Sequence, residues 1–76
     1  MRKWVRFMTN KQQMMIEMNT QEIIAQIIED EHLSIDDAMK KFYTSVAFEK
    51  LSDVETGLYL EGADYLVEYF KRRKYL

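Results

Sequence analysis

The fold is decided by residues 19–43, which read NTQEIIAQIIEDEHLSIDDAMKKFY. Isoleucines recur at helical spacing at positions 23, 24, 27 and 28, and glutamine and acidic residues lie outside that stripe. Asn19 followed three residues later by Glu22 matches the reciprocal capping box that begins many helices. The pattern predicts an amphipathic helix over residues 20–31 with Asn19 as its N-cap.

A second helix is predicted within the same stretch. Ser34 is a favoured N-cap residue, and Asp36 and Asp37 place carboxylates in the first turn, where the helix dipole favours negative charge. One face of this helix carries the apolar residues Ile35, Ala38, Met39 and Phe42. The helix therefore runs to about Tyr43, and the connection of about three residues before it favours an antiparallel or steeply crossed pair.

Two short elements are predicted next. Residues 45–51 indicate a third helix, although Val46 and Phe48 also permit a strand over so short a run. Residues 52–57, SDVETG, match a capping box that starts at Ser52 and is followed by Gly57, a residue free to take positive φ. This pattern predicts one helical turn that stops at the glycine.

A final helix is predicted from about Gly62 to Lys74. Its core-facing residues recur at i, i+3, i+4 and i+7, and they are Ala63, Leu66, Val67 and Phe70. Chain organisation before residue 18 permits two interpretations, because an amphipathic helix and a late translation start at one of several methionines both fit. We therefore predict an N-terminal extension of residues 1–17 and a single helical domain of residues 18–76.

Composition agrees with this all-α fold, a small compact bundle of about four helices in which one is a single turn. A 76-residue chain has room for one core, and its 47% apolar residues are enough to fill it. There is no proline, and the absence of cysteine excludes disulfides and thiolate chemistry, which fits a reducing cytoplasm. The longest apolar runs have two or three residues, far from the ~20 that a membrane span needs.

The net charge of −2 conceals a strong segregation along the chain. Residues 1–18 carry a net charge of +3, residues 19–70 carry −9, and residues 71–76 carry +4. The body of the protein is thus acidic and both ends are basic. Such asymmetry bears on the choice of partner more than on the fold.

The residue patterns disfavour catalysis, cofactors and metals. His32 is the only histidine, and its acidic neighbours at positions 29–31 point in different directions on a helix, so they do not converge on one ion. Ser34, Ser45 and Ser52 each stand where a helix cap is expected. No glycine-rich phosphate loop occurs. We expect a protein that is not an enzyme and that has no cofactor and no metal site.

Residues 33–70 resemble a family of small uncharacterised bacterial helical proteins. The resemblance lies in Phe42-Tyr43, Ser45, the turn Leu51-Ser52-Asp53-Val54-Glu55-Thr56-Gly57-Leu58-Tyr59, and the tyrosine-rich last helix. This chain has Gly62 where the family commonly has serine. Some members are companions of proteins similar to ADP-ribosyltransferase toxins, so the resemblance implies an antitoxin-like or regulatory role in a bacterial cytoplasm, with a neighbouring-gene product as the partner.

The tyrosines and the basic end of the last helix are the candidate contact residues. Tyrosines and methionines give apolar contact area at modest entropic cost, and the chain has more aromatic residues than one small core requires. The candidates are Tyr59, Tyr65, Tyr69, Lys71, Arg72, Arg73 and Lys74. They favour a protein-binding module whose partner is another protein or a second copy of the chain in a homodimer.

Two other functions remain open at this stage. The basic run at residues 71–74 could contact DNA in a transcriptional regulator, although the acidic body would repel phosphates and Asp36 and Asp37 occupy the helix that would read bases. Alternatively, residues 29–31 together with Asp36 and Asp37 could mimic a phosphate backbone and inhibit a nucleic-acid enzyme. Protein binding is the leading hypothesis, and nucleic-acid binding is the alternative.

Overall fold

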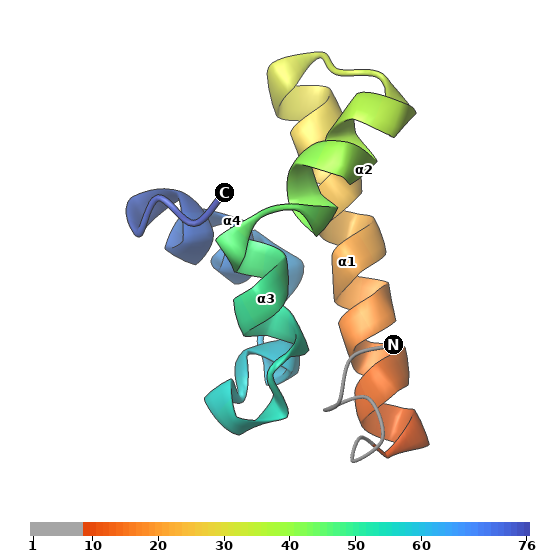
Figure 1. The fold of residues 1–76 in the computed structure, drawn as a ribbon, viewed down its shortest axis with the longest axis vertical. Helices are drawn as coiled ribbons and strands as arrows, with labels where there is room; N and C mark the ends of the chain where they lie inside the picture. Colours follow the sequence, from red (N-terminus) through yellow and green to blue (C-terminus); the bar gives the residue numbers. More distant parts are fainter. Residues whose placement is uncertain (1–8) are drawn as a thin grey trace.

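The computed structural model describes residues 9–76 and shows an all-α fold, as the sequence predicts (Figure 1). No strand occurs in this part of the chain, so the strand interpretation of residues 45–51 is wrong. The α-helices are α1 (Asn10–Glu31), α2 (Ile35–Tyr43), α3 (Val46–Ser52) and α4 (Ala63–Arg72). Two single-turn 3-10 helices, η2 (Val54–Thr56) and η3 (Leu58–Leu60), connect α3 to α4.

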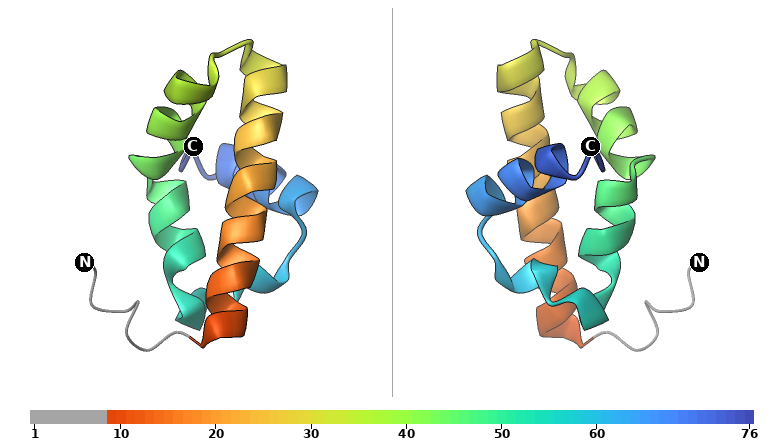
Figure 2. Two further views of the ribbon diagram at one scale, coloured as in Figure 1. Left: turned by 90° about the vertical axis from the view of Figure 1, so that its right-hand side faces the viewer. Right: turned by 90° about the vertical axis from the view of Figure 1, so that its left-hand side faces the viewer.

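The long helix α1 forms one side of the molecule, and the rest of the chain packs along it. Figure 2 shows α2 and then α3 running back beside α1, and α4 crossing α1, behind it in the left-hand view. With its 22 residues α1 is about 33 Å long at 1.5 Å per residue, close to the 35 Å longest dimension of the protein. It contacts α2, α3, α4 and η3.

The core is the set of apolar faces that these helices turn toward one another. From α4, all four predicted residues are buried. From α1, the predicted positions 23, 24 and 27 are buried and Ile28 is half-buried. The largest fully buried side chains are Phe42, Phe70, Ile23, Ile27, Leu51 and Leu66. One core thus draws on all four helices.

The start of α1 differs from the prediction. The helix begins at Asn10, about three turns before the predicted residue 20, and its N-cap is Thr9. The Thr9 hydroxyl accepts from the Gln12 backbone N–H at 3.1 Å, and the Thr9 N–H donates to Gln12 Oε1 at 3.0 Å. The prediction placed the cap at Asn19 because that residue directly precedes the isoleucine stripe, and it took no account of the Thr-x-x-Gln pattern at residues 9–12.

Asn19 lies inside α1 and has another role. Its side-chain amide donates to the carbonyl oxygens of Tyr59 at 3.0 Å and Glu61 at 3.2 Å, which ties η3 to α1. The predicted boundary after residue 17 falls within this helix, and Ile16 on its N-terminal side is buried in the shared core. Residues 10–17 are therefore helical. Residues 1–8, the remainder of the predicted N-terminal extension, lie outside the described residues.

The turn from α1 to α2 is close to the prediction. His32 takes a left-handed conformation (φ 55°) that ends α1, and the Ser34 hydroxyl caps α2 by accepting from the Asp37 N–H at 3.1 Å. Ala38 and Phe42 are buried as expected. Ile35 and Met39, which share the predicted apolar face, are exposed, so the core covers only part of that face. So short a helix buries only a narrow strip against α1.

The segment from α3 to α4 confirms the turn and corrects its cap. Asp53, not Ser52, caps the single turn η2 by accepting from the Glu55 N–H at 3.0 Å, and Ser52 is the buried last residue of α3. Gly57 has φ 70° and ends the turn, as predicted. Gly62 is the N-cap of α4, and no side-chain hydrogen bond caps that end.

The last residues fold back onto α3. The helix α4 ends at Arg72, two residues before the predicted Lys74, which has φ 59°. The Tyr75 N–H then donates to the Phe70 carbonyl at 2.9 Å, and the Ala47 N–H donates to the Tyr75 carbonyl at 3.1 Å. One orphan donor at the start of α3 is satisfied in this way. None of the helices formed by residues 9–76 combines the length and apolar character that a bilayer-spanning helix needs.

The two glycines should respond oppositely to substitution. Gly57→Val places a β-branched residue at positive φ and should lower the free energy of unfolding by about 1–2 kcal/mol. Gly62→Ser adds the missing N-cap side chain to α4 and should raise it by about 0.5 kcal/mol. Neither new Cβ atom meets a neighbour within 4 Å, so backbone effects decide both results. Urea denaturation measures the two changes, and equal losses would contradict the assignment.

Residues 10–17 should also contribute to stability. Ile16→Ala removes a buried side chain and should cost about 2–4 kcal/mol. Met14→Ala, on an exposed position of the same helix, is the matched control and should cost less than about 0.5 kcal/mol. If both variants melt like the parent chain, the core does not include this part of α1.

Candidate interaction surface

The structure separates Tyr59 from the other predicted contact residues. Tyr59 belongs to η3, is half-buried and packs against the core. The Gln12 side-chain amide donates to its hydroxyl at 3.0 Å, and its backbone carbonyl accepts from Asn19. Tyr59 thus fastens η3 to α1.

Tyr65, Tyr69 and Arg73 form one row along α4, which we call the Tyr–Arg row. The Tyr65 and Tyr69 rings stack with centroids 5.9 Å apart and planes 23° apart. The Arg73 guanidinium carbon lies 4.7 Å from the Tyr69 ring centroid, in the range of a cation–π contact. The spacing of four residues places successive side chains above one another on a helix. The two tyrosine rings and the guanidinium therefore follow one another along one face of the helix.

Burial differs along this row. Tyr65 is 51% exposed, and Arg73 is exposed. Tyr69 is half-buried and meets the core residue Phe70 edge to face, with centroids 5.8 Å apart. The contact with Phe70 thus fixes the Tyr69 ring, and this ring in turn orders the more exposed side chains of Tyr65 and Arg73.

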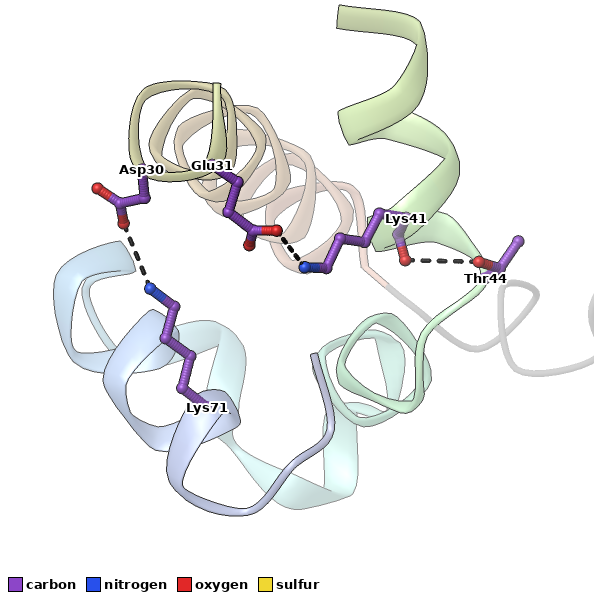
Figure 3. Close-up of polar contacts among 5 residues, drawn as sticks. All are labelled: Asp30, Glu31, Lys41, Thr44 and Lys71. Atoms are coloured by element: carbon purple, nitrogen blue, oxygen red, sulfur yellow. Dashed lines mark hydrogen bonds and ion pairs between the residues drawn. The ribbon is translucent and has the colours of Figure 1, made fainter. Parts of the chain in front are cut away.

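The basic run at residues 71–74 is divided between two environments. Lys71 Nζ lies 3.3 Å from Asp30 Oδ2 at the end of α1 (Figure 3). Arg72 and Lys74 are exposed. One of the four predicted cationic contacts is therefore used within the protein, and Arg73 is held over Tyr69.

The acidic end of α1 is held by lysines from two other helices. Figure 3 shows that Asp30 and Glu31, although adjacent, diverge toward Lys71 of α4 and Lys41 of α2. The last turn of α1 has no basic residue of its own, and carboxylates there oppose the helix dipole. The two lysines offset this cost. Two of the five proposed phosphate-mimicking acids, Asp30 and Glu31, are therefore already paired. These pairs lie at surface positions, where each contributes little, about 0–1 kcal/mol.

Other candidate groups have structural roles. Ser34 and Ser45 cap α2 and α3, as predicted. His32 is exposed at the end of α1. Among residues 9–76, no group of three or more histidine, aspartate and glutamate side chains is placed to hold a metal ion.

A second exposed apolar surface was not predicted. Ile35, Met39 and Tyr43 follow one another at a spacing of four on α2, and they are 64%, 39% and 41% exposed. Tyr43 is held by an edge-to-face contact with Phe48, with centroids 4.9 Å apart. The signal was present in the sequence, because α2 has more apolar residues than a nine-residue helix can bury on one side.

No protein-family model matches this chain, and no curated protein or solved structure shows significant similarity to it. The resemblance of residues 33–70 to the family described above therefore stays a prediction.

Tyr59 and Tyr65 should differ sharply when each is replaced by alanine. Tyr59→Ala removes core packing and the contact with Gln12, and should cost about 2–4 kcal/mol of unfolding free energy. Tyr65→Ala should cost less than about 1 kcal/mol, since the ring is half-exposed and loses mainly its stack on Tyr69. Thermal unfolding followed by circular dichroism compares them. A larger loss for Tyr65 would mean that this ring belongs to the core.

Proposed function

We propose that this chain is a small non-enzymatic protein-binding module that docks its partner on the Tyr–Arg row of α4. The observation that carries the proposal is a half-exposed tyrosine stacked on an anchored tyrosine, which in turn lies beneath an arginine. Tyrosine and arginine are the residue types, with tryptophan, that dominate binding energy in protein interfaces.

The order of this row supports the proposal energetically. Immobilising a long side chain at an interface costs about 0.5–1.5 kcal/mol. Stacking already restricts Tyr65 and Arg73 before any partner arrives. Binding therefore loses less side-chain entropy than it would with unsupported side chains.

The surroundings of the row favour a partner with an apolar centre and an acidic rim. Arg72 and Lys74 flank the row and are exposed. The guanidinium of Arg73 offers a planar donor set that suits carboxylates. A partner carboxylate placed beside this end would gain charge-assisted hydrogen bonds.

The resemblance of residues 33–70 supports a more specific role as a regulator or antitoxin-like companion in a bacterial cytoplasm. Under this proposal the partner is the product of a neighbouring gene. The Tyr–Arg row lies mostly within the resembling segment, since Tyr65 and Tyr69 belong to it.

DNA or RNA binding is the second candidate, and the same residues favour it. Aromatic rings beside exposed cations form stacking platforms for bases. Against it, Lys71 is engaged by Asp30, and residues 19–70 carry a net charge of −9 that repels phosphates. Protein binding therefore has the stronger support.

A photo-cross-linking amino acid at position 65 should capture a specific partner protein in the native host cell. The same amino acid at Glu22, an exposed position on α1, serves as the control and should not capture it. With the captured partner purified, Tyr65→Ala should weaken its binding at least about tenfold, whereas Tyr65→Phe, which keeps the stack, should change affinity by less than about threefold. Unchanged affinity of Tyr65→Ala would overturn the proposed surface.

Titration with duplex DNA and single-stranded RNA tests the alternative. We expect dissociation constants weaker than about 100 µM at physiological salt, typical of the weakest non-specific binding. Tight, steeply salt-dependent binding that the pair Arg72→Ala and Lys74→Ala abolishes would instead favour the nucleic-acid function.

A further inference from the structure

The side chains of α2 form rows with different properties. Ala38 and Phe42 are buried against the rest of the protein. The adjacent row is Ile35, Met39 and Tyr43, which we call the α2 apolar row; it is exposed, and Val46, at the start of α3 and also exposed, follows it. The apolar face of α2 is therefore wider than the part of it that the rest of the protein buries.

A charged row follows the α2 apolar row on its solvent side. Asp36 and Lys40 are each one position later than Ile35 and Met39, so the two rows run side by side. Both side chains are exposed, and within residues 9–76 neither forms an ion pair. By contrast, Lys41, one row further on, is paired with Glu31. The flank of the apolar row thus carries one unpaired acid and one unpaired base.

This arrangement is self-complementary under a twofold axis. An axis perpendicular to α2 near Met39 sets this residue against its own copy and places Ile35 opposite Tyr43 of the second copy. Such an axis leaves the charged rows of both copies on the same side of the interface, running in opposite directions. Asp36 of each copy then lies beside Lys40 of the other, and both pairs have opposite charges. A parallel pairing about an axis along the helices would place the charged rows of the two copies on opposite flanks of the interface, so that neither Asp36 nor Lys40 would meet an opposite charge from the other copy.

We propose that a second copy of this chain covers the α2 apolar row, with the two α2 helices antiparallel. Charge complementarity favours a second copy as the occupant. Asp36 of each copy meets Lys40 of the other, so both charges of one copy find opposite charges on its partner. Tyr43 contributes a side chain already ordered by Phe42 and Phe48. Closed twofold symmetry is the commonest arrangement of protein oligomers.

The dimer is expected to be weak. A single nine-residue helix buries less than the ~800 Å² per partner of a standard stable interface. We expect a dissociation constant of about 10–100 µM, so that the monomer and dimer exchange as concentration changes.

This proposal does not rest on the proposed function, since it concerns α2 and the partner surface concerns α4. If both hold, the dimer presents two Tyr–Arg rows, and binding to a dimeric or surface-bound partner gains from two linked contacts. If the chain does not self-associate, the proposed partner surface on α4 still stands. If cross-linking at Tyr65 captures no partner, the proposed α2 dimer still stands.

A charge exchange on the full chain tests the antiparallel pairing by sedimentation equilibrium. Asp36→Lys alone and Lys40→Asp alone each place like charges together and should weaken the dimer about tenfold or more. The double variant restores opposite charges and should return to within about threefold of the parent. Asp37→Lys is the matched control, because it makes the same charge change in the same helical turn on another row, and it should leave the dimer unchanged. Far-UV circular dichroism of each variant establishes that the monomer is folded.

An apolar substitution tests the contact itself. Met39→Asp should abolish self-association at concentrations up to about 1 mM while the monomer remains folded, since the side chain is exposed. Met18→Asp, at an exposed methionine on α1, is the control and should still dimerise. A parent chain that stays monomeric at this concentration overturns the proposal, as does a dimer that Met39→Asp does not weaken. A double charge variant that fails to recover overturns the antiparallel arrangement.

Discussion

The structure depends on the burial of one face of α1. With 76 residues the chain cannot build independent layers, and α2, α3, α4 and η3 all pack against this helix. The face is made of isoleucines, and Ile23 and Ile27 at its centre are almost fully buried. Each of the other helices is too short to be stable alone in water, so each depends on this contact.

Polar contacts at both ends of α1 position the elements that pack on its apolar face. Near its N-terminal end, Gln12 and Asn19 bind the hydroxyl and backbone of the η3 region. At its C-terminal end, Asp30 and Glu31 reach to α4 and α2 (Figure 3). Exposed ion pairs add little stability, but the amide contacts of Asn19 satisfy two carbonyl groups that the short 3-10 turns leave open. The orientation of α4, and with it the Tyr–Arg row, follows from contacts at both ends of α1.

Local signals were read correctly where the relevant partners are close in sequence. Ser34, Ser45 and Gly57 act within their own turns, and α4 has a stripe that no neighbour contradicts. The predicted cap at Asn19 is wrong because the partners of its side chain, Tyr59 and Glu61, lie about forty residues away, and a capping motif has the same sequence whether or not a helix precedes it.

The same limit applies to the candidate surface. The spacing of Tyr65 and Tyr69 placed them beside each other, but Arg73 over the Tyr69 ring and the burial of Tyr59 depend on how α4 and η3 dock. Exposure of Ile35 and Met39 likewise depends on the narrow contact between α2 and α1. A helical pattern identifies apolar residues, but it does not state how many of them a neighbour covers.

The contacts of Asn19 have a consequence for the order of folding. They join residues that are separated by 40 and 42 positions in the sequence, whereas α1 and α2 are joined by a short turn. Closing the longer loop costs more chain entropy, so the α1–α2 hairpin should form first and the segment from η3 to α4 should dock last. Elements that dock last through few contacts are also those that open most readily from the native state. A chaperone or protease that samples transient openings would therefore encounter α4, with its tyrosines, before it encounters the hairpin.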